Sequence, residues 1–329
     1  MRKAVITGTG SYVPEQVLKN EYFNELLGED VDTWLRENLT IEQRHWCADD
    51  ESTVDLCEKA ALKALECAGI AAKELDQIII STDTPEYISP ATASVLQHRL
   101  GAEGAGTFDL NTACAGFVSA IDTASKYILA DEQYKHILVI GVYAMSKYLN
   151  KSDKKTVTLF ADGAGAVILS ANDNTDSGFL NAHQFTQGQY HDWMGIYAGG
   201  TYCPITEMAV QNGKHQLQFV KKFPKELNPE MWTKMSLRMA REASIEVSQV
   251  SKFFLTQINI NSIYEMLENL NLAKDKAKYI MDKYGYTGSA AIPMALDEAV
   301  RNGEIQKGDY IFLIGSGGGL SFAGAAFKF

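Results

Sequence analysis

The sequence predicts an α/β fold in which helices cover both faces of a sheet. Strands and helices alternate along the chain, and strands such as Gln77 to Thr82 are apolar throughout. Such strands are typical of sheets that are buried on both sides. A second observation is a repeat, because the apolar segment His136 to Gly141 has the same pattern as Tyr310 to Gly315. A glycine-rich strand follows each segment, which indicates an internal duplication.

In the first half, the helix from Ser52 to Ala68 has the clearest boundaries. Ser52 can cap its start, Asp55 lies three residues further on, and Gly69 follows its end. The other helices predicted here span 20–27, 32–38, 90–101 and 115–130. The predicted strands span 4–10, 77–82, 106–110, 136–142 and 162–169.

In the second half, Asn228 and Pro229 predict the start of a helix that runs to about Ala243. Strands are expected at 252–256, 310–315 and 317–327, and helices at 262–270 and 290–301. The join between the halves lies near 172–177, which predicts an N-terminal half of residues 1–172 and a C-terminal half of 173–329. Residues 187–222 look irregular, and they are either a lid, interface or pocket wall, or a surface loop.

Composition and charge restrict the class of protein. A chain of 329 residues with 46% hydrophobic content can bury a large core, and a net charge of −11 argues against a general nucleic-acid surface. Apolar runs are short, which predicts no membrane span and a cytoplasmic protein. The cysteines show no C-x-x-C pair, so we expect reduced thiols and no metal site. These cysteines are Cys47, Cys57, Cys67, Cys114 and Cys203.

Cys114 lies where the predicted strand Gly106 to Leu110 turns into a helix. A helix N-terminus leaves unpaired N–H groups and a partial positive charge. These features favour thiolate over thiol and can hold the oxyanion of a thioester adduct. Two interpretations stay open at this point: Cys114 is a nucleophile, or it is a small residue packed at a crowded joint beside Ala113 and Ala115.

Four segments together resemble the β-ketoacyl-acyl-carrier-protein synthase III family of thiolase-fold condensing enzymes. They are Asp109 to Phe117, Phe160 to Ala166, Ala291 to Ala299 and Gly317 to Gly319. The resemblance covers the whole chain in the right order. It implies a duplicated αβαβα five-layer sandwich, which agrees with the repeat, and a homodimer.

The resemblance also implies an activity. The cysteine takes an acyl group from coenzyme A or an acyl carrier protein and passes it to a carbon nucleophile made by decarboxylating a malonyl thioester. Cys114 is the acylated residue by this match, and the Gly318 N–H is a second oxyanion donor beside the Cys114 N–H. No cofactor beyond these thioester substrates is implied.

Further residues match substrate-binding positions of the family. Trp34 is at the position that stacks on the adenine of coenzyme A, and Lys154 and Lys155 are close to a basic residue that holds the nucleotide. Tyr87 lies in the segment that lines the acyl pocket and reaches the dimer interface.

The chain departs from the family at two catalytic positions. The family's histidine lies in a proline-histidine-glutamine-alanine-asparagine context, and we assign its position to Gln257. The family's asparagine, in a glycine-asparagine-threonine-serine context, is replaced by Tyr286. The loop that carries family arginines has Asn38 and Glu42 at two of their positions, which affects the prediction of coenzyme A binding.

Gln257 and Tyr286 can both donate hydrogen bonds, but neither exchanges protons near neutral pH as an imidazole does. We therefore expect a protein that is acylated on Cys114 but condenses weakly or unusually. It passes the acyl group to another acceptor, or it holds the acyl group beside a paralogous synthase in a heterodimer. A third interpretation is a protein that has lost catalysis. Only His191 and His215, in the irregular segment, are candidates to replace the missing histidine.

Overall fold

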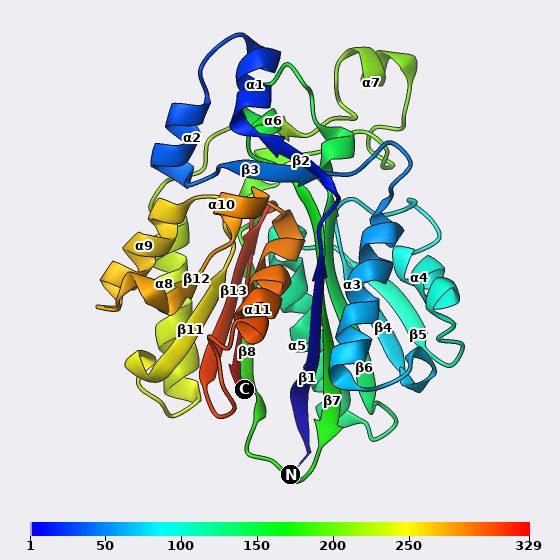
Figure 1. Cartoon of the computed structure of the whole chain (residues 1–329), viewed down its shortest axis with the longest axis vertical. Coiled ribbons are helices and arrows are strands. Elements are labelled where there is room, and N and C mark those ends of the chain that lie inside the picture. The colour runs from blue at the N-terminus through cyan, green and yellow to red at the C-terminus, as the bar shows by residue number, and fades with distance from the viewer. Residues whose placement is uncertain (1) are drawn as a thin grey trace.

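The computed structural model describes residues 2–329 and contains two five-stranded sheets of the same topology (Figure 1). The strand order of the first sheet is β1 (Lys3–Tyr12), β7 (Asp162–Asn172), β6 (His136–Ala144), β4 (Gln77–Ser81), β5 (Gly106–Leu110). The strand order of the second sheet is β8 (Gly178–Thr186), β14 (Ser321–Lys328), β13 (Tyr310–Gly317), β11 (Val250–Leu255), β12 (Ala277–Lys278). In each sheet, taken in this order, the first two pairs of neighbouring strands are antiparallel and the last two pairs are parallel. The predicted duplication is therefore confirmed.

The helices form three layers around the two sheets. Helices α5 (Gly116–Ala130) and α11 (Ala291–Arg301) contact strands of both sheets and lie between them. Helices α3 (Thr53–Ala68) and α4 (Thr92–Leu100) cover the outer face of the first sheet, and α8 (Leu227–Glu242) and α9 (Ile260–Asn269) that of the second (Figure 1). The five-layer αβαβα sandwich is confirmed.

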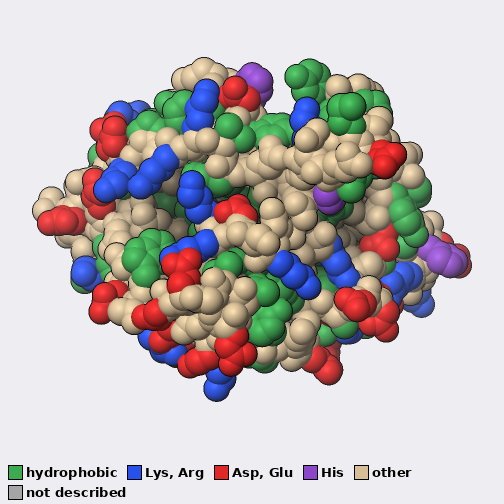
Figure 2. All heavy atoms as spheres, turned by 90° about the horizontal axis from the view of Figure 1, so that it is seen from above, with side chains coloured by type: hydrophobic (Ala, Val, Ile, Leu, Met, Phe, Trp, Pro, Cys, Tyr) green, Lys and Arg blue, Asp and Glu red, His purple; other side chains and the backbone are tan. Residues whose placement is uncertain are grey.

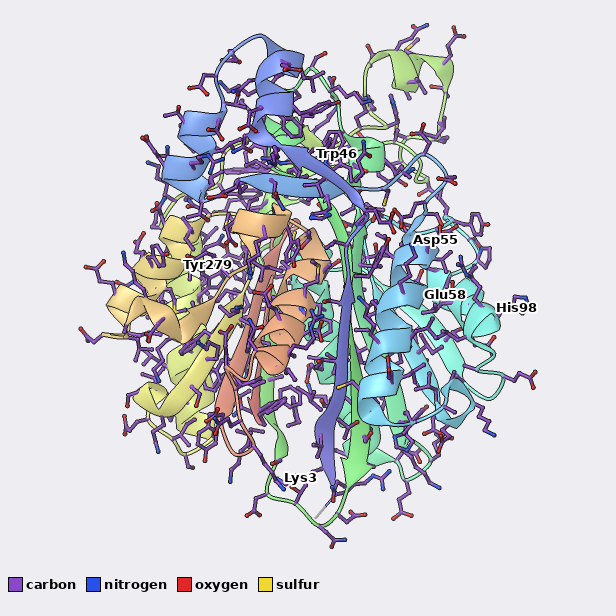
Figure 3. The ribbon with its side chains drawn as sticks, in the orientation of Figure 1. Lys3, Trp46, Asp55, Glu58, His98 and Tyr279 are labelled. Atoms are coloured by element: carbon purple, nitrogen blue, oxygen red, sulfur yellow. The ribbon has the colours of Figure 1, made fainter. Side chains whose placement is uncertain are left out.

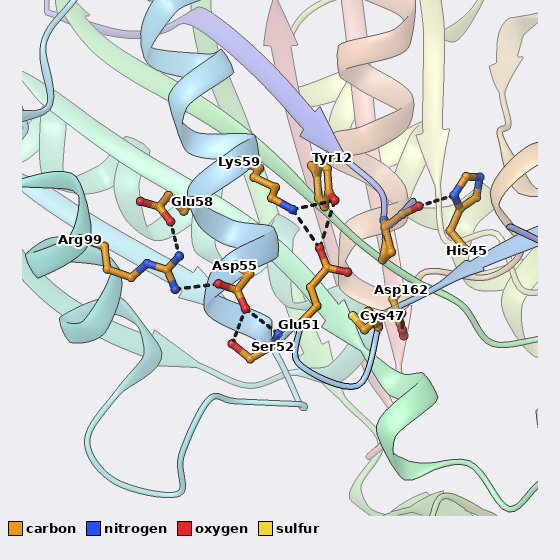
Figure 4. Close-up of polar contacts among 12 residues, drawn as sticks. Tyr12, His45, Cys47, Glu51, Ser52, Asp55, Glu58, Lys59, Arg99 and Asp162 are labelled. Carbon is orange, nitrogen blue, oxygen red and sulfur yellow. Dashed lines mark hydrogen bonds and ion pairs between the residues drawn. The ribbon is translucent and has the colours of Figure 1, made fainter. Parts of the chain in front are cut away.

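Local sequence explains the boundaries of α3. Ser52 and Asp55 form the predicted capping box, and Gly69 ends the helix in the left-handed region with a φ of 68°. Arg99 from α4 bonds both Asp55 (2.9 Å) and Glu58, so that the two outer helices are tied together (Figure 4).

A cap of short elements covers one end of the sandwich. It contains the antiparallel pair β2 (Gln16–Lys19) and β3 (Gln43–Trp46). The helices of the cap are α1 (Asn20–Leu27), α2 (Asp32–Leu39), α6 (Lys154–Val157) and α7 (Glu207–Gln211). Trp46 joins the cap to the body, because its Nε1 donates to the Phe160 carbonyl oxygen at 3.0 Å (Figure 3).

Some element boundaries differ from the prediction. Helix α8 begins at Leu227, so Asn228 lies inside its first turn and does not cap it. The irregular segment 187–222 contains the small sheet of β9 (Met194–Gly195) and β10 (Gln218–Phe219), together with α7. Strand β7 ends at Asn172 and β8 begins at Gly178.

No helix within residues 2–329 combines the length and apolarity needed to cross a membrane.

Candidate active site

The carboxyl ends of three parallel strands meet at the centre of the first sheet. Ser81, the last residue of β4, pairs with Leu110 of β5 and with Gly141 of β6. Crevices at this edge of parallel sheets are where α/β proteins place their ligands. Cys114 lies on the 3₁₀ turn Ala113–Ala115, which follows β5 and directly precedes α5.

The turn that carries Cys114 is tightly constrained. Ala113 has a φ of 48°, in the left-handed region that non-glycine residues adopt at a cost. Gly317 from the second sheet lies against this turn, and a Cβ there would be 2.5 Å from the Thr112 oxygen and 2.6 Å from the Cys114 nitrogen. Both halves of the chain therefore fix the position of the cysteine.

Cys114 lines a cavity of about 60 Å³, although only 3% of its surface is exposed. The other lining residues come mainly from the second half of the chain. They are Met194, Phe223, Pro224, Leu227, Asn228, Thr256, Ile258, Tyr286, Ser316, Gly317, Gly318 and Leu320. The irregular segment and its continuation to Pro224 therefore provide a pocket wall.

Burial controls the protonation of Cys114. It raises the pKa of the thiol to about 12, and the nearby charge of Asp83 adds to the rise. Hydrogen bonds from the Tyr286 hydroxyl and from the Cys114 N–H lower this pKa by less. Desolvation therefore acts against the helix start, which the sequence analysis expected to favour the thiolate.

Tyr286 lies directly beside the thiol. Its main chain is fixed by two bonds of 2.9 Å, from the Ala161 N–H to the Tyr286 oxygen and from the Tyr286 N–H to the Leu159 oxygen. Its ring packs on Phe160 with centroids 5.5 Å apart. Burial raises the pKa of the phenol well above its usual value, so the hydroxyl stays a donor.

Gln257 does not face the cavity, which corrects its assignment as a catalytic residue. Its Oε1 accepts the Ile280 N–H at 2.8 Å, and its Nε2 donates to the Lys278 oxygen at 3.2 Å. The side chain therefore supports the segment that connects β12 to α10 (Met281–Tyr284).

Thr256 is the residue that lines the cavity at this place. Aligning Gln257 and Asn259 with the glutamine and asparagine of the family context puts Thr256 at the histidine position. The Thr256 hydroxyl accepts the Ser316 N–H at 2.9 Å and donates to the Ser316 oxygen at 3.2 Å. Its donor is therefore already used.

The remaining predicted residues lie away from the thiol, except Gly318, which lines the cavity. Trp34 on α2 is 51% exposed and Tyr87 is 53% exposed. On α6, Lys154 pairs with Glu29 at 2.8 Å and Lys155 is exposed. None of these four lines the cavity, and neither do the candidate histidines His191 and His215.

The loop in which Asn38 and Glu42 stand at the positions of family arginines also lies outside the cavity. Glu42 pairs with Arg36 at 3.0 Å, and the Asn38 side chain donates to the Trp34 oxygen at 3.0 Å. The arginine that is retained, Arg44, is buried and donates to Asn20 and to the Thr158 oxygen. These residues stabilise the cap.

Sequence reasoning missed Asp83, which follows β4 near the thiol. Its Oδ1 is enclosed and has no hydrogen-bond partner within the described residues. Burial raises the pKa of this carboxyl to about 6. The signal in the sequence was a charged residue two positions after the largely apolar strand Gln77–Ser81. No cluster of three or more His, Cys, Asp or Glu arranged for a metal occurs in residues 2–329.

Comparisons with known proteins agree with this architecture. The family profile described as 3-Oxoacyl-[acyl-carrier-protein (ACP)] synthase III matches residues 108–188, and its C-terminal counterpart matches 240–329. Beta-ketoacyl-[acyl-carrier-protein] synthase III of Clostridioides difficile is 35% identical, over 99% of this chain and 98% of its own.

Two solved structures are similar over nearly the whole chain. The 3-oxoacyl-(acyl carrier protein) synthase III of Pseudomonas aeruginosa has a TM-score of 0.90 and 29% identity, covering 99% of this chain and 98% of its own. The priming β-ketosynthase of the R1128 polyketide pathway has a TM-score of 0.87 and 26% identity, covering 99% and 96%. Profile, sequence and fold thus agree that the chain belongs to the β-ketoacyl-acyl-carrier-protein synthase III family of condensing enzymes.

Proposed function

We propose that this protein is an acyl-thioester transferase that becomes acylated on Cys114 and condenses only weakly by decarboxylation. The observation that carries the proposal is the cavity that reaches the Cys114 sulfur and is lined by Tyr286 and Gly318. In this mechanism the sulfur attacks the thioester carbonyl carbon and the donor thiol leaves. The N–H groups of Cys114 and Gly318 and the Tyr286 hydroxyl are the donors for the oxyanion.

Weak decarboxylation follows from the groups that face the substrate. Thr256 already uses its hydroxyl proton on Ser316, and Tyr286 is a single donor that stays protonated. Loss of one well-placed oxyanion donor typically reduces a rate by about 10²–10³. An enolate formed from a malonyl thioester therefore lacks much of its stabilisation, and a hydroxyl, an amine or a preformed carbanion is the better acceptor.

The cavity favours a small acyl group. Its volume of about 60 Å³ exceeds the roughly 10–15 Å³ that one water needs, but it is too small for a long chain. Tyr143 is buried near Cys114, and a Cβ on Gly288 would be 2.6 Å from its ring. Tyr143 also packs against Phe160, with ring centroids 6.2 Å apart. We infer that these buried aromatic rings limit the length of the acyl chain.

The donor is proposed to be acyl-CoA or an acyl carrier protein, because both carry their thioester on an arm with phosphate at its other end, and lysines lie beside the cavity. Exposed lysines flank the lining residues Phe223 and Pro224, and α6 contacts β10 just before them. We call this group the lysine rim; it consists of Lys154, Lys155, Lys221, Lys222 and Lys225. Figure 2 shows that Lys and Arg side chains lie on the end of the molecule that carries the cap, interspersed with Asp and Glu. A local positive field attracts phosphate even on a chain of charge −11.

The proposed compartment is the cytoplasm, and the proposed assembly is a homodimer. The described cysteines are all free thiols, in keeping with a reducing compartment.

Strand β5 is an edge strand with partly exposed residues, and Tyr87 and Ile88 expose 53% and 82% of their surfaces. Pairing of two β5 strands would satisfy this edge. Light scattering should give twice the chain mass, and a monomer at micromolar concentration would contradict this assembly.

A second candidate function is an acyl-holding or non-catalytic subunit that pairs with a paralogous synthase. The protonated, nearly enclosed thiol favours it, because such a thiol reacts slowly by itself. This candidate predicts that Cys114→Ala leaves the activity of a heterodimer unchanged.

Acylation is tested by incubating the protein with a panel of short acyl-CoA and acyl-carrier thioesters and recording intact mass. We expect a mass increase equal to one acyl group with at least one donor, lost in Cys114→Ala and kept in Cys67→Ala, since Cys67 is exposed elsewhere. The absence of an adduct with every donor would reject the proposal. Release of carbon dioxide from a malonyl thioester by the acylated protein should be slow compared with a typical relative.

A further inference from the structure

Arg44 is an unusual residue for the interior of the cap. It lies on β3 and none of its surface is exposed, whereas arginine is rarely fully buried unless it is paired with a carboxylate. The groups that accept its hydrogen bonds are uncharged and belong to Leu18, Asn20 and Thr158. Its guanidinium also lies over the Phe23 ring, 4.3 Å from the centroid, and its Nε is enclosed without a partner in residues 2–329. Burying such a cation costs free energy, which makes its contacts informative.

The guanidinium of Arg44 reaches the segment that lies beside Tyr286. Its Nη2 donates to the Thr158 oxygen at 2.7 Å. The chain that continues from Thr158 is bonded to Tyr286 on both sides. The Tyr286 N–H donates to the Leu159 oxygen, and the Ala161 N–H donates to the Tyr286 oxygen, each at 2.9 Å. Arg44 therefore holds one end of the segment to which the Tyr286 backbone is attached.

The base of the Arg44 side chain contacts the residue before Tyr286. This residue is Gly285, with a φ of 65°, and a Cβ on it would lie 2.9 Å from the Arg44 Cβ. Gly285 directly follows α10, and β3 and α10 are in contact here (Figure 1). The two ends of the Arg44 side chain thus contact the chain on either side of the Tyr286 backbone.

The position of Tyr286 decides whether its hydroxyl reaches the sulfur. Tyr286 lines the same cavity as Cys114, and its hydroxyl donates a hydrogen bond to the sulfur. Hydrogen bonds weaken steeply when their length and angle depart from the preferred values. A small displacement of the Tyr286 backbone would therefore reduce the support that the thiolate receives.

We propose that Arg44 is a positioning residue, which holds Tyr286 from the cap so that its hydroxyl stays at the Cys114 sulfur. Arg44 does not line the cavity and acts through its contacts with Thr158 and Gly285. The inference rests on the role of Tyr286 in the proposed acylation of Cys114. It deepens that proposal by naming the group outside the cavity that sets the geometry of this donor.

Alkylation of Cys114 by iodoacetamide tests this role without an acyl donor. Peptide mass spectrometry gives the alkylation rate between pH 7 and 10, and exposed Cys67 serves as the reference thiol in the same sample. Arg44→Met removes the guanidinium and keeps an unbranched side chain. We expect the Cys114 rate at pH 8 to fall about tenfold, because a displaced Tyr286 hydroxyl supports the thiolate less, with the Cys67 rate unchanged.

A merely structural role of Arg44 predicts the opposite sign. A loosened cap would expose the nearly enclosed thiol to the reagent, and Cys114 would react faster. An equal or faster rate in Arg44→Met would overturn the proposal. Arg44→Lys keeps a charged donor and should recover part of the rate. Arg36→Met is the matched control, since Arg36 is exposed on the same cap and pairs with Asp32 and Glu42, and it should leave the Cys114 rate unchanged.

Combining Arg44→Met with Tyr286→Phe shows through which group Arg44 acts. If Arg44 places the Tyr286 hydroxyl, Arg44→Met should change the Cys114 rate by less than about twofold once that hydroxyl is absent. A second fall of about tenfold in the double variant would mean that the two residues act independently, and would overturn the proposal. Should Arg44→Met not fold, Arg44→Lys takes its place in this cycle, and its smaller effect should likewise disappear in Tyr286→Phe.

The acyl-adduct assay separates this proposal from the proposed function. If the two substitutions are coupled in alkylation but the unaltered protein takes an acyl group from no donor, the positioning role stands and acyl transfer fails. If the adduct forms but Arg44→Met changes neither its rate nor the alkylation of Cys114, acyl transfer stands and the positioning role is rejected.

Discussion

At the scale of single residues, burial and hydrogen bonding oppose each other at Cys114. Burial favours the neutral thiol, and the Tyr286 hydroxyl favours the charged sulfur. In a cavity closed to most solvent, each donor that remains has a larger effect than it would have in water. The reactivity of the thiol therefore depends on few groups, each of which can be tested by substitution.

Replacement Tyr286→Phe removes one of these groups and keeps the ring. The pKa of Cys114 should rise further, because the hydrogen bond that lowers it is lost. We expect the rate of acyl-adduct formation, followed by intact mass, to fall about 10²-fold. Tyr284→Phe, two residues away and outside the cavity, is the matched control and should keep the normal rate.

Decarboxylation should return when the family residues are placed where they face the cavity. Thr256→His with Tyr286→Asn puts an imidazole beside Cys114, and we expect carbon dioxide release from a malonyl thioester to increase at least about tenfold. Gln257→His with Tyr286→Asn should give no increase, because Gln257 points to the backbone of Lys278 and Ile280. Equal effects of the two pairs would show that the cavity assignment is wrong.

Physical reasons explain why the sequence is sufficient to predict some residues around the thiol and not others. Cys114 and Tyr286 follow from motifs with fixed spacing, and the structure brings them together. The Gln257 assignment fails because consecutive residues in an extended segment point in opposite directions, so an error of one residue reverses the side chain. Asp83 is one polar residue after a strand, and only the folded chain shows that its Oδ1 is enclosed.

At the scale of elements, the Cys114 turn is held by strand β13 of the opposite sheet. A Cβ on Gly315 would be 2.7 Å from the Ala115 Cα, and Gly317 is equally close to the turn. All three atoms nearest to Gly317 belong to the backbone, which cannot rotate away as a side chain can. The glycines of β13 are therefore required by close approach.

Gly317→Ala should displace this turn. We expect a loss of about 1–3 kcal/mol in the free energy of unfolding, measured by denaturant titration, and a loss of acylation. Gly104→Ala is the control, since a Cβ there meets nothing within 4 Å. Normal acylation and stability in Gly317→Ala would mean that the two sheets are less closely packed than described.

The long amphipathic helices and apolar strands could be predicted because their patterns are strong. Helix α1 spans Asn20–Leu27 as expected, and α3 keeps both predicted caps. The short elements β2, β8, β9 and β12 were missed, since two to nine residues with mixed polarity give little periodicity. They form through pairing with distant strands, such as β8 with β14.

At the scale of the whole molecule, duplication places one helix of each half, α5 and α11, between two sheets. The nucleophile lies just before the start of α5 in the first half, and residues of the second half, including the end of β13, line the rest of its cavity. A single half would leave the Cys114 turn without Gly317 and the cavity without most of its lining. The active site therefore requires the complete chain.

Asp83, a partly buried residue whose Oδ1 is enclosed, should also reduce global stability at neutral pH. Its pKa is raised from 3.8 to about 6, so folding favours the protonated form. Its effect is therefore absent at low pH, and stability is lost as pH rises from about 4 through 6. Compared with the unaltered protein, Asp83→Asn should be more stable at pH 7.5 by at most about 3 kcal/mol, and similar at pH 3.5. Denaturant titrations at both pH values check this, and a pH-independent difference would contradict the raised pKa.

The most direct test of the account is to locate the acyl group after incubation with a short acyl thioester and proteolysis. The account predicts the acyl mass on the peptide that contains Cys114, with the peptides of Cys67 and Cys203 unmodified. Acylation of those more exposed thiols with Cys114 left free would contradict it.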